Sequence, residues 1–186
     1  LTYGKDVYDQ ERYERIRQLS AMMMADISNK PVKQVEGLFC NEVGYQTPKI
    51  DTRAAIFKED KILLVQEKNG TWSLPGGWCD VNVSVMENTI KEVKEEAGLD
   101  VVVKNVIAIQ DREKHNQPIY AYKVCKIFML CEVEGGVFKE NSETIGFDYF
   151  TKDNLPILAT EKNNEEQIQM CFDAYKAGEK WKTYFD

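Results

Sequence analysis

Three acidic residues share one face of a predicted helix, a short distance after two adjacent glycines. Glu92, Glu95 and Glu96 lie at positions i, i+3 and i+4 within the stretch LPGGWCDVNVSVMENTIKEVKEEAGL, residues 74–99. Like charges at this spacing repel one another and weaken a helix. A divalent cation bound to that face would remove the repulsion, and carboxylates are the hard oxygen ligands that Mg²⁺ or Mn²⁺ prefers. The spacing therefore predicts a metal-binding face.

The glycine turn distinguishes this prediction from an ordinary solvated helix. Taken alone, the stretch KEVKEEAG is typical of a surface helix, because Lys91 and Glu95 form an oppositely charged i, i+4 pair. Directly upstream, however, Gly76 and Gly77 allow the backbone to approach a ligand closely and leave a carbonyl able to point at it. We therefore expect the carbonyl oxygen of Gly76 to join the acids as a metal ligand.

The same segment resembles the Nudix box, G-x5-E-x7-R-E-U-x-E-E-x-G-U, in which U is an apolar residue. Gly77 matches its first position, and residues 91–99, KEVKEEAGL, match its distal half. The resemblance implies an α/β/α sandwich. It also implies an enzyme that hydrolyses a nucleoside diphosphate linked to a group X, with Mg²⁺ or Mn²⁺ as cofactor. In that comparison Glu92, Glu95 and Glu96 resemble the main metal ligands.

The resemblance also implies a further acid downstream of the box. In the stretch ENSETIGFDYF, residues 140–150, Glu143 matches the family's position better than Glu140 does. An acid at this position in the family completes the metal site or acts as the general base. Glu92 and Glu143 are therefore the two candidates for the residue that accepts a proton from the attacking water.

Two positions depart from the box. Val83 stands where the box has its first Glu, and Lys91 stands where it has Arg. Valine cannot replace a carboxylate in a polar role, and lysine keeps the charge of arginine without its two-pronged geometry. We expect activity to survive, because the distal acids are all present. The departures leave open a non-catalytic Nudix-fold sensor that binds nucleotides without hydrolysing them.

Similarity beyond the box indicates one branch of the family. The stretches LTYGKDVYDQERYERIRQLS, DTRAAIFKEDKILLVQE and DREKHNQP resemble a branch that has an N-terminal helical segment. That branch hydrolyses X-linked nucleoside diphosphates and includes CDP-choline and ADP-ribose pyrophosphatases. The resemblance favours CDP-choline narrowly, with ADP-ribose as the alternative substrate.

Several residues are candidates for binding the substrate. Gly77 belongs to the box, and Arg112, Lys114 and His115 form a cationic patch in a predicted loop, for which a solvated polar loop is the alternative. Arg53, at the start of the first predicted strand, binds phosphate or belongs to a buried ion pair. Three aromatic residues could stack on a base, although core packing is the favoured interpretation: Trp72, Trp78 and Tyr120.

The hydrophobic periodicity predicts helices and strands in mixed order. The predicted helices span residues 9–27, 85–97 and 164–177, and the predicted strands span residues 52–57, 62–66, 72–74, 101–109, 120–133 and 147–150. Asp9 is the expected N-cap of the first helix, and Gly98 ends the second. Hairpins among the strands favour an α/β (α+β) fold built on a mixed sheet.

Composition indicates how the chain is organised and where it works. The predicted division is a helical segment and linker at residues 1–47 and a catalytic domain at residues 48–186. The first predicted helix carries an apolar stripe at steps of three and four, formed by Tyr13, Ile16, Leu19, Met23 and Ile27. This stripe is too large to leave in water, so we expect a homodimer. Five scattered cysteines without a C-x-x-C pair suit reduced thiols in the cytoplasm.

The charge and the apolar runs limit the possible partners. A net charge of −7 argues against nucleic acid as the main partner, and no apolar run is long enough to span a membrane.

Overall fold

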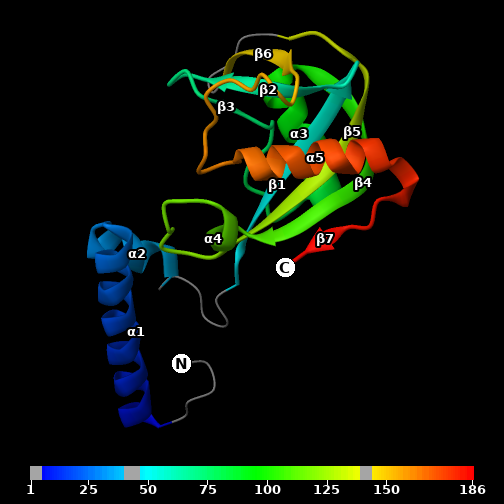
Figure 1. Ribbon diagram of the computed structural model, residues 1–186. Helices are drawn as coiled ribbons and strands as arrows, with labels where there is room; N and C mark the ends of the chain where they lie inside the picture. The colour runs from blue at the N-terminus through cyan, green and yellow to red at the C-terminus, as the bar shows by residue number, and fades with distance from the viewer. Residues whose placement is uncertain (1–5, 40–46, 139–143) are drawn as a thin grey trace. The chain divides into compact units, whose positions relative to one another are not determined.

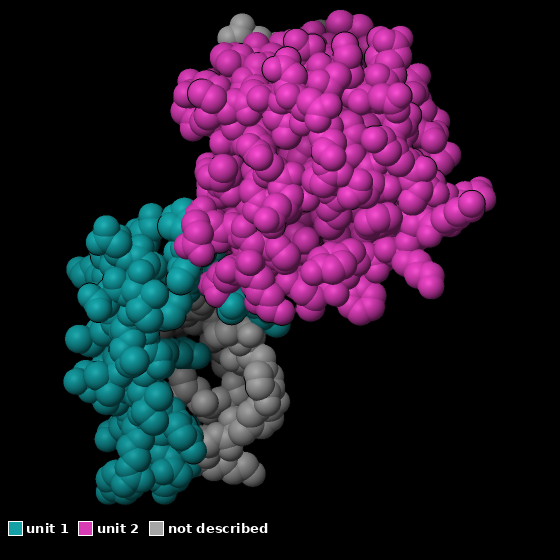
Figure 2. Space-filling view, in the orientation of Figure 1, with its two compact units in different colours: residues 1–48, 118–123 teal, residues 49–117, 124–186 magenta. Residues whose placement is uncertain are grey.

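The computed structural model describes residues 6–39, 47–138 and 144–186 (Figure 1). The chain divides into two compact units, which Figure 2 colours separately. The first comprises residues 1–48 and 118–123, and the second comprises residues 49–117 and 124–186. The second unit therefore holds the glycine turn, the acidic helix and the strands that support them.

Two helices form the first unit, α1 (Val7–Ser28) and α2 (Val32–Phe39). The side chain of Asp6 caps α1, because it accepts hydrogen bonds from the backbone amides of Tyr8 and Asp9 at 2.8 and 3.3 Å. The prediction that Asp9 caps this helix is wrong, since Asp6 already adopts the extended cap conformation three residues earlier. The helix therefore begins two residues before its predicted start.

The apolar stripe predicted on α1 is exposed. The small core of this unit uses other residues, namely Ala21, Ala25, Val35 and Ala121. The stripe itself is open to solvent at five positions: Tyr13, Ile16, Leu19, Met23 and Ile27. The predicted contact of this stripe with a second copy of the chain stays a prediction.

A seven-stranded mixed sheet forms the centre of the second unit. Its strands are β1 (Lys49–Lys58), β2 (Lys61–Glu67), β3 (Trp72–Ser73), β4 (Leu99–Asp111), β5 (Val124–Gly136), β6 (Thr144–Phe150) and β7 (Tyr184–Phe185). They follow the order β3-β2-β1-β5-β4-β7, with β6 paired to β2. The pairs β1–β5 and β4–β7 are parallel, whereas the other pairs are antiparallel.

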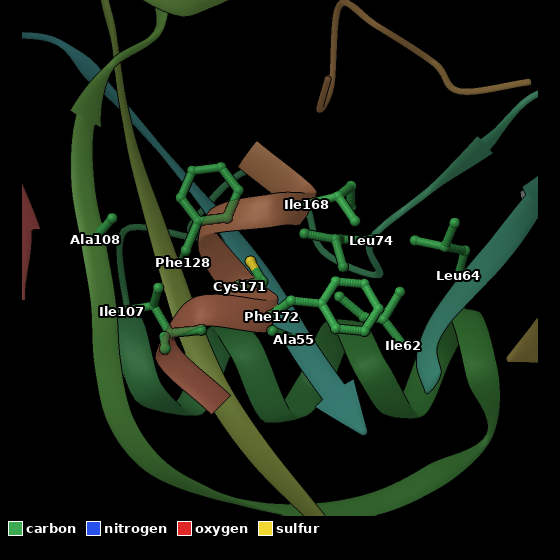
Figure 3. Packing of buried hydrophobic residues seen from close by; sticks show 11 residues of the cluster. Ala55, Ile62, Leu64, Leu74, Ile107, Ala108, Phe128, Ile168, Cys171 and Phe172 are labelled. Carbon is green, nitrogen blue, oxygen red and sulfur yellow. The ribbon is translucent and has the colours of Figure 1, made fainter. Parts of the chain in front are cut away.

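Helices cover both faces of this sheet (Figure 1). The covering helices are α3 (Val85–Ala97) and α5 (Glu165–Ala177), and the unit also contains α4 (Arg112–His115) and the 3₁₀ helix η1 (Gly178–Lys180). Successive side chains of a strand point to opposite faces, so Ala54 of β1 packs with Val93 of α3, whereas Ala55 packs with Phe172 of α5. Figure 3 shows the cluster beneath α5. The predicted α/β sandwich on a mixed sheet is confirmed.

Three local features differ from the prediction. Residues 112–115, expected within a loop, form the single-turn helix α4, which Asp111 caps through the amide of Glu113. The strand expected from Tyr120 begins only at Val124, because residues 118–123 belong to the first unit. The C-terminal strand β7 was not predicted, since two residues are too few to show a periodicity.

The described part of the chain was also compared with the expectations for the cysteines and for membrane-spanning helices. The described cysteines are free thiols, at Cys79, Cys125, Cys131 and Cys171, whereas Cys40 lies outside the described residues. No described helix is both long and apolar enough to cross a membrane.

Candidate active site

Helix α3 begins and ends where its sequence dictates. The hydroxyl of Ser84 accepts a hydrogen bond from the amide of Glu87 at 3.2 Å, and the carboxylate of Glu87 accepts one from the amide of Ser84 at 2.8 Å. This reciprocal pair is a capping box. At the other end, Gly98 adopts a left-handed conformation with φ of 70°. Both ends are therefore fixed, and the acidic face keeps a defined orientation toward the sheet.

Two of the three predicted metal-binding acids are buried on α3. Glu92 is 9% exposed and Glu96 is 5% exposed, which is unusual for ionised side chains. The side chain of Glu95, by contrast, is 59% exposed. The structure therefore separates the acids into a buried pair and one that faces solvent.

The double-glycine turn lies directly against this buried pair. The amide of Gly76 donates a hydrogen bond to Oε2 of Glu96 at 2.8 Å. A Cβ atom on Gly76, whose φ is +144°, would lie 1.9 Å from the carbonyl oxygen of Thr52, and a Cβ on Gly77 would lie 2.7 Å from Oε2 of Glu92. Only glycine fits at position 76, because a side chain would collide with the backbone of β1, whereas a side chain at position 77 would displace the carboxylate of Glu92.

Backbone hydrogen bonds hold the turn to β1. The amide of Thr52 donates to the carbonyl of Gly77 at 2.9 Å, and the amide of Ala54 donates to the carbonyl of Pro75 at 2.8 Å. The turn contacts Glu96 through the amide of Gly76, so a ligand role for the Gly76 carbonyl stays a prediction. The turn is thus a rigid part of the sheet.

Burial makes ionisation of both carboxyl groups unfavourable. Desolvation raises the pKa of Glu96 to about 7, although the charge of Arg53 and the hydrogen bond from Gly76 oppose the shift. Desolvation likewise raises the pKa of Glu92, with the charge of Glu95 adding to the effect and that of Lys91 opposing it. A divalent cation would favour the ionised forms of both groups.

Lys91, at the arginine position of the box, lies among three acids. Its Nζ is 2.9 Å from Oδ2 of Asp80, 3.5 Å from Oε1 of Glu92 and 3.7 Å from Oε2 of Glu95. The hydrogen bond to Asp80 is the largest of the effects that raise the pKa of Lys91. Although Val83 lacks a carboxylate, Asp80 therefore supplies an acidic partner for the lysine.

Arg53 belongs to a buried ion pair next to the turn. Its Nε and Nη2 donate to the two carboxylate oxygens of Asp51 at 2.9 and 2.7 Å, and its Nη1 donates to the carbonyl of Leu74 at 3.2 Å. On β5, Nζ of Lys126 lies 3.8 Å from Oδ2 of Asp51. Lys126 is 1% exposed, and its desolvation lowers its pKa to about 7. The double-glycine turn therefore lies next to a buried cluster of charged side chains, formed by Asp51, Arg53 and Lys126.

The other predicted substrate-binding residues lie around α4. Arg112 is buried there, whereas Lys114 and His115 face the C-terminal residue. Nε2 of His115 is 2.8 Å from Oδ2 of Asp186, and Nζ of Lys114 is 3.9 Å from the same atom. His115 also lines a cavity of about 270 Å³ together with residues of α5 and Tyr184 of β7. The structure therefore brings Arg53 and Gly77 to the acids, but it directs Lys114 and His115 toward Asp186.

The donor set fits a divalent cation in part. Glu92 and Glu96 are hard oxygen donors held beside one glycine turn, and their raised pKa values favour a compensating cation. Within the described residues, however, no three His, Cys, Asp or Glu side chains form a group able to hold a metal ion. Glu143 lies outside the described residues, while its sequence neighbour Thr144 donates a hydrogen bond to the carbonyl of Glu96 at 2.7 Å.

Sequence reasoning missed three charged residues of this region, which are Asp51, Asp80 and Lys126. A signal existed for Lys126, because it is the one charged residue in the otherwise apolar run VCKIFMLC, residues 124–131. A charge in a buried strand requires a partner, and Asp51, two positions before Arg53, provides it. Asp80 carries no such signal, since it lies in a polar turn before the helix.

The fold and this site define a class of protein, an α/β/α sandwich that presents buried carboxylates beside a double-glycine turn. Residues 47–171 match the NUDIX domain family, and residues 1–39 match Nudix_N, described as a UDP-X-like, N-terminal oligomerisation domain. The chain therefore belongs to the Nudix family, as the box indicated. It is a hydrolase of diphosphate bonds.

Similar proteins support this assignment over the whole chain. A putative ADP-ribose pyrophosphatase of Bacillus subtilis, YjhB, is 44% identical over 187 residues, covering 100% of this chain and 89% of the relative. The crystal structure of an ADP-ribose pyrophosphatase from Streptococcus suis is 56% identical, with a TM-score of 0.71 over 75% of this chain and 100% of its own. A crystal structure of UDP-X diphosphatase is 32% identical, with a TM-score of 0.72 over 100% of this chain and 90% of its own.

Proposed function

We propose that this chain hydrolyses the diphosphate bond of a nucleoside diphosphate linked to a group X. The products are a nucleoside monophosphate and phosphorylated X. The observation that carries the proposal is the burial of Glu92 and Glu96 against the Gly76–Gly77 turn. Family membership supports the reaction class, and the burial of these acids beside the turn supports a role for them in the reaction.

Each residue near the turn has a proposed role. Glu92, Glu95 and Glu96, together with the carbonyl of Gly76 and with Glu143, would hold Mg²⁺ or Mn²⁺. When bound, the ion supplies positive charge that neutralises the diphosphate oxygens as the bridging P–O bond breaks. Glu92 or Glu143 accepts the proton from the water that attacks phosphorus.

The remaining groups position the substrate. Gly77 allows the diphosphate to approach the backbone closely, because it has no side chain. Arg53, fixed by Asp51 and by the carbonyl of Leu74, holds positive charge behind the turn. Arg112, Lys114 and His115, at the end of β4, bind the more distant phosphate or the group X.

Two conjugates are the first substrates to test. The names of the Bacillus subtilis and Streptococcus suis relatives favour ADP-ribose. The resemblance of the N-terminal and loop segments to the CDP-choline branch favours CDP-choline. The name of the UDP-X diphosphatase adds a uridine conjugate to the set. We place ADP-ribose first, because a relative of this name matches the chain along its full length.

The test is a substrate panel with a matched pair of variants. ADP-ribose, CDP-choline and UDP-glucose are incubated with the full chain in Mg²⁺, Mn²⁺ or EDTA, and the nucleoside monophosphate is measured. Glu92→Gln removes a buried acid of α3, and Glu165→Gln removes an exposed acid of α5 as the control. We expect one conjugate to be hydrolysed only with metal, and only Glu92→Gln to lose that activity. Nucleotide binding without turnover in any metal would instead indicate the sensor.

We propose that residues 1–47 form a dimerisation segment and residues 48–186 the catalytic domain. Support comes from the exposed apolar stripe of α1 and from the match to an N-terminal oligomerisation domain. Light scattering should give the mass of a homodimer, and Ile16→Glu with Met23→Glu should shift it toward the monomer. Arg15→Glu, on the same helix but outside the stripe, is the control. A monomeric wild-type chain would overturn this proposal. The expected cytoplasmic location stays a prediction.

A further inference from the structure

A second segment of the chain, residues 157–163, lies alongside the strand that leads into the double-glycine turn. The amide of Trp72 in β3 donates to the carbonyl of Ile157 at 2.9 Å, and the amide of Ala159 donates to the carbonyl of Trp72 at 2.8 Å. The segment ends just before α5 begins at Glu165. It therefore connects the backbone before the turn to the helix on the other side of the sheet from α3.

The last residue of this segment, Asn163, binds the backbone at the start of the turn. Its Oδ1 accepts a hydrogen bond from the amide of Leu74 at 2.8 Å. Nη1 of Arg53 donates to the carbonyl of the same residue at 3.2 Å. Asn163 and Leu74 are both fully buried. Removing the Oδ1 acceptor would therefore leave a buried amide without this partner.

The other polar atom of the Asn163 side chain makes no such bond. Nδ2 is buried and has no hydrogen-bond partner within the described residues. An apolar residue of similar volume would also leave one buried donor unsatisfied, in that case the amide of Leu74. Because the two costs are of the same kind, hydrogen bonding gives asparagine little net advantage in stability. Its distinct effect is to fix the position of the Leu74 backbone.

A shift of Leu74 would be passed on to the contact between the turn and Glu96. Only Pro75 separates Leu74 from Gly76, and the proline ring fixes the φ angle at that position. The amide of Gly76 donates to Oε2 of Glu96 at 2.8 Å. The peptide group that Asn163 holds is therefore two residues from the bond between the turn and a buried acid.

We propose that Asn163 is a positioning residue for diphosphate hydrolysis. Its Oδ1 fixes Leu74, and the rigid Pro75 carries that constraint to the Gly76 amide that orients Glu96. Asn163 thus acts through the backbone of residues 74–76 rather than by contact with the substrate. This inference rests on the proposed function, since it takes Glu96 to act in the reaction.

The kinetic test compares two substitutions of Asn163 with one of its neighbour. Asn163→Leu keeps the volume without the acceptor, whereas Asn163→Asp keeps the acceptor. We expect Asn163→Leu to lower kcat for the hydrolysed conjugate roughly 10- to 100-fold, with KM within about threefold, because a small misplacement of a reacting group has an effect of this size. Asn163→Asp should retain kcat within about threefold.

Asn164→Ala is the control for a loss of stability without displacement of the turn. Oδ1 of Asn164 caps α5 by accepting from the amide of Gln167 at 2.9 Å. Losing this cap should lower the melting temperature and leave kcat as in wild type. Asn163→Leu should lower the melting temperature no further than Asn164→Ala does, although it loses kcat.

Hydrogen exchange in the metal-free chain gives a readout that needs no substrate. The exchange of the Leu74 and Gly76 amides is measured by NMR relative to the amides of β5. In Asn163→Leu both should exchange roughly 2- to 10-fold faster than in wild type, as expected for the loss of one hydrogen bond. Asn163→Asp and Asn164→Ala should leave the two relative rates unchanged.

Three outcomes would overturn the inference. Asn163→Leu could leave kcat and both exchange rates unchanged. Asn163→Asp could lose as much kcat as Asn163→Leu, so that the acceptor is not what matters. Asn163→Leu could lower the melting temperature well beyond Asn164→Ala with kcat unchanged, which makes Asn163 structural. If Asn163→Leu does not fold, Asn163→Ala is measured against the same expectations. Failure of the proposed function is a separate result, in which wild type hydrolyses no conjugate although exchange of the Leu74 amide still depends on Asn163.

Discussion

Helices α3 and α5 have the same length and the same type of N-terminus, yet α3 buries carboxylates and α5 does not. Each has 13 residues and a capping box, with Ser84 or Asn164 as the N-cap. Helix α3 buries the carboxylates of Glu92 and Glu96 besides the amide of Asn88, whereas the buried polar side chain of α5 is the amide of Gln167. The two helices lie on opposite faces of one sheet, and the glycine turn packs against the carboxylates of α3.

The buried amide of α5 and the buried carboxylates of α3 also differ in how well they are hydrogen-bonded. The amide of Gln167 donates to Gln110 and Asn116 and accepts from Asn116 and the backbone of Asn164, all at 2.9–3.0 Å. A buried amide with all of its partners stabilises the fold. The buried carboxyl of Glu96 instead has its pKa raised to about 7 by desolvation, so its charge is costly until a cation compensates it. We infer that α5 is structural and that α3 carries the chemistry.

The largest expected effect follows from replacing a buried carboxylate of α3 with an amide. Glu96→Gln keeps the shape of the side chain and its acceptor for the Gly76 amide but removes the charge. We expect kcat for the hydrolysed conjugate to fall about 10²- to 10³-fold, as when one electrostatic group of an active site is removed. The melting temperature of the metal-free variant at pH 8 should equal or exceed that of wild type, because a buried charge is gone. A lower melting temperature would mean that Glu96 is structural.

Removing the buried amide of α5 should instead lower the stability of the protein and leave its activity unchanged. Gln167→Leu has similar volume but removes one hydrogen-bond partner from the buried amide of Gln110 and one from that of Asn116. We expect the free energy of unfolding to fall by about 1–3 kcal/mol, measured by urea denaturation, while kcat and KM stay within about twofold. Gln169→Leu, in the same helix but paired on the surface with Asp173, is the control. Loss of activity without loss of stability would contradict the comparison.

Local sequence predicted α3 well because its determinants are local. The capping residue Ser84 and the C-terminal Gly98 lie next to the helix they bound, and the observed range 85–97 matches the prediction. The i, i+3, i+4 spacing placed the acids on one face, but only the fold separates the buried Glu92 and Glu96 from the exposed Glu95. Burial depends on where the glycine turn packs, which the helix sequence does not specify.

The pairing of Asp51 with Lys126 behind the turn could not be predicted, because its determinants are not local. Asp51 and Lys126 are 75 positions apart in sequence and meet because β1 and β5 pair in parallel with these two residues in register. A parallel pair of this kind is set by the whole sheet rather than by a turn. The same holds for Asp186, which contacts His115 after β7 pairs with β4.

The buried cluster of charges that includes Lys126 gives a smaller, pH-dependent effect on stability. The folded protein lowers the pKa of Lys126 to about 7 through burial and the charge of Arg53, against the attraction of Asp51, whereas the unfolded chain keeps its proton until about 10.5. Between these pH values the unfolded state binds more protons, so stability rises with pH. Relative to Lys126→Met, wild type should gain roughly 1–3 kcal/mol of unfolding free energy between about pH 7 and about pH 9.

Urea denaturation of wild type and Lys126→Met across this pH range measures that difference. Because Met retains the apolar stem of lysine without a charge, the variant should show a flatter profile. Lys104→Met, which removes a lysine paired with Glu132 on the surface, controls for the loss of one positive charge. If wild type and Lys126→Met have parallel profiles, the amine of Lys126 does not lose its proton in the folded protein over this range.

The smallest effect concerns the lysine that replaces the arginine of the box. Asp80→Asn removes the nearest acid of Lys91, whose next neighbours are Glu92 and Glu95. The amine then competes more strongly with a cation for those two acids. We expect the Mg²⁺ concentration for half-maximal activity to rise by no more than about fivefold, because exposed ion pairs contribute about 0–1 kcal/mol. Asp100→Asn, which removes the partner of Lys94 on the same helix, should leave it unchanged. A rise above about tenfold would instead make Asp80 a metal ligand and extend the chemistry of α3 into the turn before it.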